Sequence, residues 1–274
     1  TASNNVAVGY QAGFSNTTGT ENQAFGHTSL YSNTTGNYNN AFGRGAMYNN
    51  TTGSNNVAIG TQALVLNTTA NNNTAVGYQA FYSGQTADNT TALGYRALYS
   101  ATAGGHVAVG SNALYTNSTG IDNVGVGASA LRYNTTGSSN VALGLQALHV
   151  NTTASNNTAV GFQALKANTA ASGSTAVGHS AGYSQNTTGD AFNAFFGLQS
   201  GYSVTTGTKN TFIGGVNSGY AVTTGSNNTI LGNYTGNQGG LDIRTSSNNI
   251  VLSDGAGNPK FQMDYYARSI IQAT

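Results

Sequence analysis

A glycine that returns about every seventeen residues constrains this chain more than any other feature of its sequence. It ends a short apolar run, as in Asn5-Val6-Ala7-Val8-Gly9. Self-similarity at a short fixed period is typical of stacked repeat architectures rather than of globular domains. We therefore expect a solenoid, which leaves little room for a catalytic pocket. The repeat glycines are Gly9, Gly26, Gly43, Gly60, Gly77, Gly94, Gly110, Gly127, Gly144, Gly161, Gly178, Gly197, Gly214 and Gly232.

Each unit has the same order of residue types around its glycine. An apolar residue precedes the glycine, alanine usually stands two positions before it, and a second short run such as 78–82 follows it. Valine, isoleucine, threonine and aromatic residues favour strands, whereas the Asn-Thr-Thr-Gly segments that close the units favour turns. No run between turn signals has the length of a helix. The pattern predicts an all-β chain, a parallel β-solenoid or β-roll of about fourteen 17-residue coils.

Stacking places equivalent residues above one another, so the repeat predicts structural columns. Identical amides can form ladders in stacked β structure, and asparagine also suits turns. We expect one such column four positions before the glycine and a structural glycine column beside it. The asparagine column contains Asn5, Asn22, Asn39, Asn56 and Asn73, and the glycine column contains Gly9, Gly26, Gly43, Gly60 and Gly77.

Neighbouring residues of the strand before each glycine are both apolar. A strand with this pattern is buried on both faces, yet a thin coil has only one interior. The chain offers no helix or second sheet as cover, and the sequence does not say which apolar column faces the interior. We therefore expect a second copy of the chain as the partner, arranged with cyclic symmetry.

Composition excludes several classes of function. Only 5% of the residues are charged, the net charge is +1 and there is no cysteine. This composition gives no electrostatic footprint for nucleic acid, no thiolate metal site and no apolar run that could span a membrane. The sequence begins at Thr1 without a signal-peptide pattern, so we expect a fragment or a processed product.

Residues able to carry chemistry are scattered along the repeat. His27 and His179 share a column but are nine coils apart, and the seven acidic residues are mostly isolated. The segment 254–258 resembles a calcium loop only weakly, because it lacks the acidic ligands. We predict no catalytic residue, no metal site and no cofactor, and expect that the protein is not an enzyme.

An aromatic column lies five positions after the glycine. It could stack on sugar rings and so serve as a surface recognition stripe, or it could stiffen the stack or pack between chains. The threonine pairs of the turns suggest ice binding as a minor alternative, although adjacent threonines point to opposite faces of a strand. The stripe residues are Tyr31, Tyr48, Tyr82, Tyr99 and Tyr115.

The motifs 5–9 and 56–60 resemble the core motif of trimeric autotransporter adhesin heads, the YadA-type β-roll. The Asn-Thr-Thr-Gly repeats are also similar to repeat regions of phage tail-fibre proteins. The resemblance covers residues 3 to about 232 and implies a left-handed roll, three chains side by side and binding to host surfaces. Two features depart from the family: the coil here is longer at its Asn-Thr-Thr turn, and the given sequence contains no neck or coiled-coil stalk.

The spacing of the repeat glycines becomes less regular after Gly178. Phe195, Phe196 and Phe212 replace small or aliphatic residues, so we expect a wider coil there, and charges and the only proline gather at the end of the chain. We predict a repetitive β-roll over 1–232 and an irregular C-terminal cap or connector over 233–274.

The expected function is that of a structural and adhesive extracellular fibre segment, from a surface adhesin or a phage tail-fibre shaft. We expect a homotrimer at a cell surface or virion surface, with a host-surface protein or glycan as a further partner and neither nucleic acid nor a membrane span. The alternative is a mechanical filament subunit that joins end to end, with ice binding as the minor alternative.

Overall fold

The computed structural model describes residues 2–264, 266 and 268–271, and over these residues it contains strands, turns and bends but no helix. The expected fold class is confirmed: the chain forms a parallel β-solenoid of about fifteen coils of roughly seventeen residues. It divides into two compact units, Thr1–Ser138 and Ser139–Thr274.

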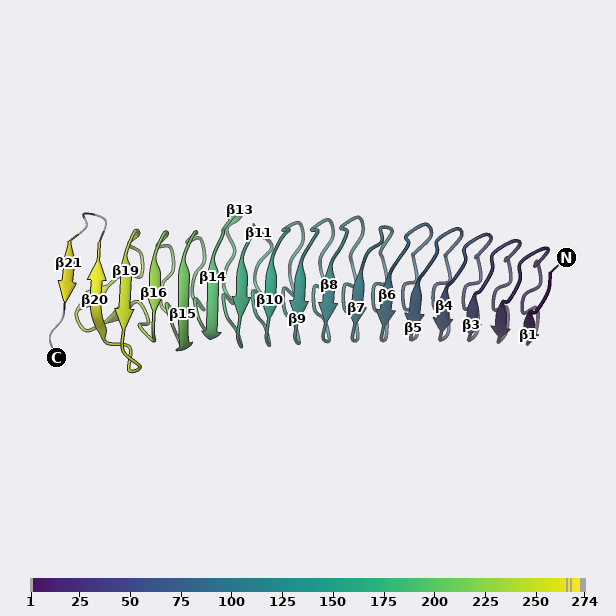
Figure 1. Ribbon diagram of the computed structural model, residues 1–274, viewed down its shortest axis with the longest axis horizontal. Coiled ribbons are helices and arrows are strands. Elements are labelled where there is room, and N and C mark those ends of the chain that lie inside the picture. Colours follow the sequence, from purple (N-terminus) through teal and green to yellow (C-terminus); the bar gives the residue numbers. More distant parts are fainter. Residues whose placement is uncertain (1, 265, 267, 272–274) are drawn as a thin grey trace. The chain divides into compact units, whose positions relative to one another are not determined.

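In the first unit, each coil contributes one three-residue strand to a parallel sheet (Figure 1). Successive strands pair without a register shift, so that Ala7 lies opposite Ala24 and Ala24 opposite Ala41. The strands are β1 (Val6–Val8), β2 (Gln23–Phe25), β3 (Asn40–Phe42), β4 (Val57–Ile59), β5 (Thr74–Val76), β6 (Thr91–Leu93), β7 (Val107–Val109) and β8 (Val124–Val126).

The second unit continues the pattern and then departs from it. A parallel series is formed by β9 (Val141–Leu143), β10 (Thr158–Val160), β12 (Thr175–Val177), β14 (Ala194–Leu198), β15 (Thr211–Val216), β16 (Thr229–Leu231) and β19 (Ile250–Ser253). A small parallel pair joins β11 (Ala170–Ser172) to β13 (Thr188–Asp190), and a short antiparallel pair joins β17 (Asn237–Gln238) to β18 (Leu241–Asp242).

The chain reverses direction after β19. There β20 (Pro259–Met263) pairs antiparallel with β19, and β21 (Ser269–Ile271) pairs antiparallel with β20. An antiparallel strand does not repeat the coil geometry, so the parallel series ends at β19 within the segment 233–274.

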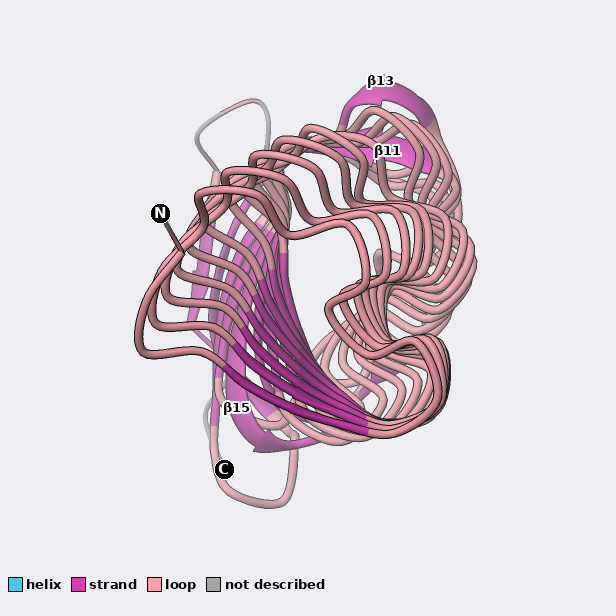
Figure 2. Ribbon diagram, turned by 90° about the vertical axis from the view of Figure 1, so that its right-hand side faces the viewer, coloured by secondary structure: helices cyan, strands magenta, loops and turns pink. Residues whose placement is uncertain are grey.

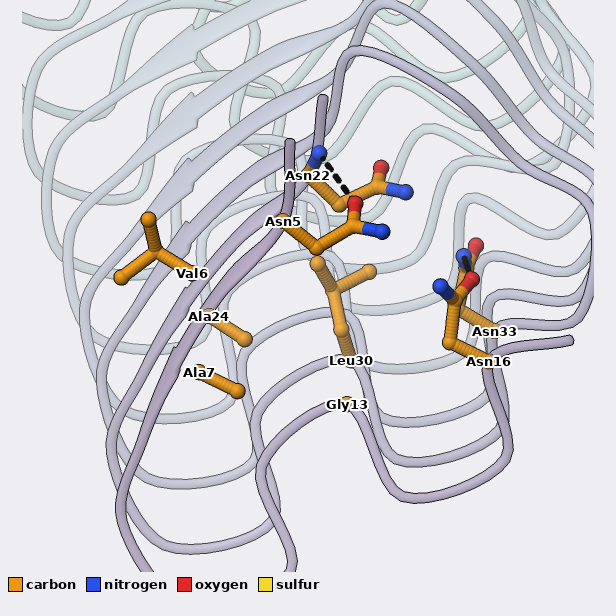
Figure 3. Close-up of a pocket in the computed structure, with 9 residues that line it drawn as sticks. All are labelled: Asn5, Val6, Ala7, Gly13, Asn16, Asn22, Ala24, Leu30 and Asn33. Carbon is orange, nitrogen blue, oxygen red and sulfur yellow. Dashed lines mark hydrogen bonds between the residues drawn. The ribbon is translucent and has the colours of Figure 1, made fainter. Parts of the chain in front are cut away.

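Each coil has the strand along one side, with turns closing the remainder of the loop (Figure 2). The alanine at the middle of the strand is buried, and its two neighbours point outward because strand side chains alternate. In the first coil, Ala7 points into the loop and Val6 points away from it (Figure 3). The alanine column therefore faces the coil interior, where it meets a buried leucine column that includes Leu64 and Leu98.

The glycine after each strand allows the coils to approach closely. At Gly60 the backbone has φ +129°, and a Cβ there would lie 2.5 Å from the carbonyl oxygen of Gly77 in the next coil. No L-residue with a side chain fits this conformation and this spacing. The repeat glycine is thus required by the stacking distance itself.

The phenylalanines of the second unit exchange places with the leucines. Phe195 and Phe212 are fully buried on the strand side, with their rings 5.5 Å apart, whereas Phe196 is exposed. Opposite them the leucine column is replaced by Gly201 and Gly219, and a Cβ at Gly201 would meet the ring of Phe195 at 2.5 Å. We expected a wider coil because phenylalanine is larger than alanine. The glycines at the leucine position offset that added side-chain volume.

Candidate interaction surface

A surface of mostly apolar side chains follows the outward side of the strands, with Gln23, Asn40, Thr74 and Thr91 as polar members in the first unit. We call it the strand face, defined in the first unit by the residues one and three positions before each repeat glycine on β1–β8. Val8 is 55% exposed and Ile59 is 44% exposed. Phe25 and Phe42 stack on this face with ring centroids 4.8 Å apart. The second unit presents an equivalent surface through residues such as Leu143, Ile213 and Leu231.

The tyrosines of the predicted recognition stripe form stacked ladders. The rings of Tyr31 and Tyr48 are 4.9 Å apart and 3° from parallel, and Tyr99 lies 4.9 Å from Tyr82 and 5.2 Å from Tyr115. Because each ring face inside a ladder is covered by its neighbour, only edges and hydroxyl groups remain for a ligand. Such a ladder suits edge-on hydrogen bonding and stiffening of the stack better than stacking on a sugar ring.

Cations lie beside the tyrosine ladders of the first unit. The guanidinium carbon of Arg96 is 5.2 Å from the ring centroid of Tyr95 and 5.6 Å from that of Tyr99, and its Nε donates to Oε1 of Gln79 at 2.9 Å. Burial raises the pKa of the Tyr99 hydroxyl, so this hydroxyl stays protonated at neutral pH. The side of the coil after the glycine is therefore aromatic with fixed positive charge.

The predicted asparagine column is buried from Asn22 onward and braces the coils that contain it. The backbone N–H of Asn22 donates to Oδ1 of Asn5 in the preceding coil at 2.8 Å, and Nδ2 of Asn22 donates across its own coil to the carbonyl of Gly36 at 2.8 Å (Figure 3). Asn39 repeats both bonds. These side chains connect successive coils and close each loop, although Nδ2 of Asn73 in the same column is buried without a hydrogen-bond partner.

A second asparagine column, which the sequence interpretation missed, forms the side-chain amide ladder. Nδ2 of Asn33 donates to Oδ1 of Asn16 at 2.9 Å, and Nδ2 of Asn50 donates to Oδ1 of Asn33 at 2.7 Å (Figure 3 shows the first pair). These asparagines begin the Asn-Thr-Thr-Gly turns and point inward. Their recurrence at one fixed place in the turn was the available signal, but it was attributed to turn chemistry alone.

The histidines remain apart from one another and from acid clusters. His27 stacks on Tyr10 and His179 stacks on Phe162. His106 is buried in the first asparagine column, and burial lowers its pKa. In the described part of the chain, no group of three His, Cys, Asp or Glu residues is placed to hold a metal ion. Asp254 instead accepts backbone bonds within its own loop and lies 3.3 Å from Nζ of Lys260.

A hollow opens at the first coil, where Gly13 occupies the leucine position (Figure 3). Its volume is about 50 Å³, whereas small-molecule sites enclose roughly 300 Å³ or more. The hollow is lined by Ala7, Leu30 and buried amides that are already hydrogen bonded. It is the uncovered end of the coil interior rather than a built binding site.

No protein-family model, no curated protein and no solved structure matches this chain. The described residues also include no helical segment with the length and hydropathy of a bilayer-crossing span.

Proposed function

We propose that the protein is a structural and adhesive fibre segment that acts outside the cell as a homotrimer. The observation that carries this proposal is the strand face. Its valine, isoleucine, leucine and phenylalanine side chains extend from coil to coil, while the interior is already filled by alanine and leucine. Contiguous apolar surface on this scale marks an interaction site.

A second copy of the chain is the partner that fits a repeating surface best. A surface that repeats once per coil is matched over its whole length only by a partner with the same spacing. Cyclic association lets each copy cover its neighbour with one contact type. Three copies are what the resemblance to autotransporter adhesin heads implies, and an adhesin head or a phage tail-fibre shaft at a cell or virion surface is the setting we propose.

The filament alternative receives less support from the two ends of the series. β1 carries a parallel partner on one side only, whereas the other end of the series finishes in the antiparallel strands β20 and β21. Because β20 and β21 do not repeat the parallel pairing of the coils, an end-to-end contact made through them would differ from the pairing within the solenoid. Electron microscopy checks this directly, since we expect discrete particles rather than long uniform threads.

Light scattering of the purified full chain at micromolar concentration tests the association. We expect the mass of three chains, and a monomer at this concentration would contradict the proposal. Ile59→Lys on the strand face should shift the protein toward monomer while leaving its circular dichroism unchanged. The matched control is Thr52→Lys in an exposed turn, which should remain a trimer.

A further inference from the structure

Charge is sorted to the two sides of the strand face in the first unit. Glu21, Asp88 and Asp122 stand five or six positions before a repeat glycine, and we call this column the acidic flank. Arg44, Arg96 and Arg132 stand one, two and five positions after a repeat glycine, and we call these three residues the arginine flank. Every Asp, Glu, Lys and Arg of residues 1–138 belongs to one flank or the other. Because each strand occupies the three positions before its glycine, the strand face separates acid from base.

Among the described residues of the first unit, these charges have no ionic partner. The ion pairs among the described residues join Asp242 to Arg244, Asp254 to Lys260 and Asp264 to Arg268, all far along the chain. In the first unit, the three acidic side chains and Arg44 are exposed.

One member of the arginine flank also has an unused hydrogen-bond donor. Arg132 lies over the rings of Tyr115 and Tyr133, and its Nε is buried without a hydrogen-bond acceptor. Buried donors are almost always paired in folded proteins, so the hydrogen bonding of Arg132 is incomplete within its own chain.

The charges of the two flanks also lie at matching positions along the solenoid axis. Asp88 and Arg96 belong to the coil of Gly94, and Asp122 and Arg132 belong to the coil of Gly127. Glu21 belongs to the coil of Gly26, one coil before that of Arg44, and adjacent coils are roughly 4.8 Å apart. Each acid thus has an arginine at its own level or the next level on the other side of the face.

We propose that a second copy of this chain packs on the strand face in parallel and in register, with the acidic flank of one copy against the arginine flank of the next. This proposal rests on the self-association proposed above. Rotation about the solenoid axis brings opposite flanks together and preserves the height of each coil. A two-fold axis perpendicular to it would reverse one copy and place acid beside acid. Complementary charge selects orientation and register in this way.

The apolar face supplies most of the affinity and the charges select the orientation. An exposed ion pair changes an association constant by only roughly two- to five-fold. Like charges that face each other across an interface lower the association constant. These repulsions add up over the several coils that carry charges. The expected signature is therefore a penalty for mismatched flanks that a full exchange removes.

The first experiment exchanges charges between the flanks in the full chain. Glu21→Arg with Asp122→Arg leaves Asp88 in place and makes the acidic flank net basic, so that both flanks are net basic. Arg44→Glu with Arg132→Glu leaves Arg96 in place and makes both flanks net acidic. We expect each half-exchanged variant to associate about ten-fold more weakly or worse, several exposed pairs acting together. The variant with all four substitutions should return to within about three-fold of the parent. Equal association of parent and half-exchanged variants, or no recovery in the full exchange, would overturn the proposal.

The second experiment measures whether neighbouring copies run parallel or antiparallel. The chain has no cysteine, so Thr18→Cys and Thr136→Cys each accept a single spin label at the same exposed turn position in two distant coils. Parallel, in-register copies give the same distance between labels for both variants, measured by double electron–electron resonance. Unequal distances in an intact assembly would refute this packing and leave self-association standing, whereas a monomeric parent would remove both proposals.

Discussion

The coils of the first unit and the later coils of the second unit fill the same interior in opposite ways. In the first unit a small alanine on the strand faces a leucine, as with Ala108 and Leu114; we call these the Ala–Leu coils. In the second unit Phe195 and Phe212 on the strand face Gly201 and Gly219; we call these the Phe–Gly coils. Coil stacking thus constrains the volume summed over facing columns, as expected for an interior packed at crystal-like density.

The same rule explains an exception inside the first unit. Phe81 occupies the leucine position there, and Gly84 replaces the asparagine that begins the turn. A Cβ at Gly84 would meet Cζ of Phe81 at 2.5 Å. The first coil shows the opposite case, because Ala7 and Gly13 are both small and the hollow remains. Compensation also crosses between coils, because Ala176 and Gly182 are both small and a Cβ at Gly182 would lie 2.7 Å from the ring of Phe195 in the next coil.

A charge in the interior should break an Ala–Leu coil most severely. Ala108 is fully buried among apolar side chains, so Ala108→Asp should lower the free energy of unfolding by about 4 kcal/mol or more, because an unpaired carboxylate is buried. Chemical denaturation followed by circular dichroism measures this loss. Val109→Asp, one residue later on the strand face, is the matched control. It should keep the fold and weaken only association, and equal unfolding of both variants would contradict the assignment of inside and outside.

Removing a ring should open a Phe–Gly coil. Phe195→Ala leaves a cavity beside Gly182 and Gly201, and should cost about 3–5 kcal/mol of unfolding free energy, whereas Leu98→Ala in an Ala–Leu coil should cost about 2–5 kcal/mol. Thermal denaturation of the two variants and the parent provides the comparison.

The exchange rule predicts a rescue of that variant. Adding Gly201→Leu to Phe195→Ala recreates the Ala–Leu pair and should recover part of the lost stability. Gly201→Leu alone should destabilise, because its side chain meets the ring of Phe195. A double variant no more stable than Phe195→Ala would show that volume exchange does not govern these coils.

The two kinds of coil also differ in the amide ladder, which is present in the Ala–Leu coils and replaced by valine in the Phe–Gly coils. Asn50 donates to Asn33 and accepts from Asn67, whereas the Phe–Gly coils carry buried Val204 and Val222 where the turn begins. Asn50→Val should cost about 1–3 kcal/mol, because it leaves buried amides of the neighbouring coils without partners. Thr52→Val in the exposed part of the same turn should change stability by less than about 0.5 kcal/mol. Urea denaturation of both variants tests the difference.

Periodicity alone was enough to predict the parallel pairing, because the strand and glycine columns share one spacing. It could not assign inside and outside, since alanine and valine alternate and either could face the interior. The ladder of Asn16, Asn33 and Asn50 was missed because asparagine in a turn already had a sufficient explanation. The glycines opposite Phe195 and Phe212 were missed because each column was interpreted by itself, whereas packing couples columns that face one another.

The smallest expected effect concerns the one coil where histidine replaces the bracing asparagine. Nδ1 of His106 accepts a bond from the backbone N–H of Asn123 at 3.2 Å, and Nε2 lies 3.0 Å from Nδ2 of Asn117. Protonation would remove the acceptor at Nδ1. Burial lowers the pKa of His106, although the nearby carboxylate of Asp122 acts in the opposite direction.

The unfolded chain therefore takes up the proton at a higher pH than the folded chain. Stability should be constant above the unfolded pKa of about 6.5 and fall as the pH decreases from there to the folded pKa, by no more than about 1.4 kcal/mol per pH unit. His106→Asn restores the residue of the neighbouring coils and should remove this part of the pH dependence while keeping the fold. Melting temperatures of both proteins between pH 7 and pH 5 give the comparison. Parallel curves over that range would mean that the imidazole has the same proton affinity in the folded and unfolded chain, and that the coil tolerates the charge.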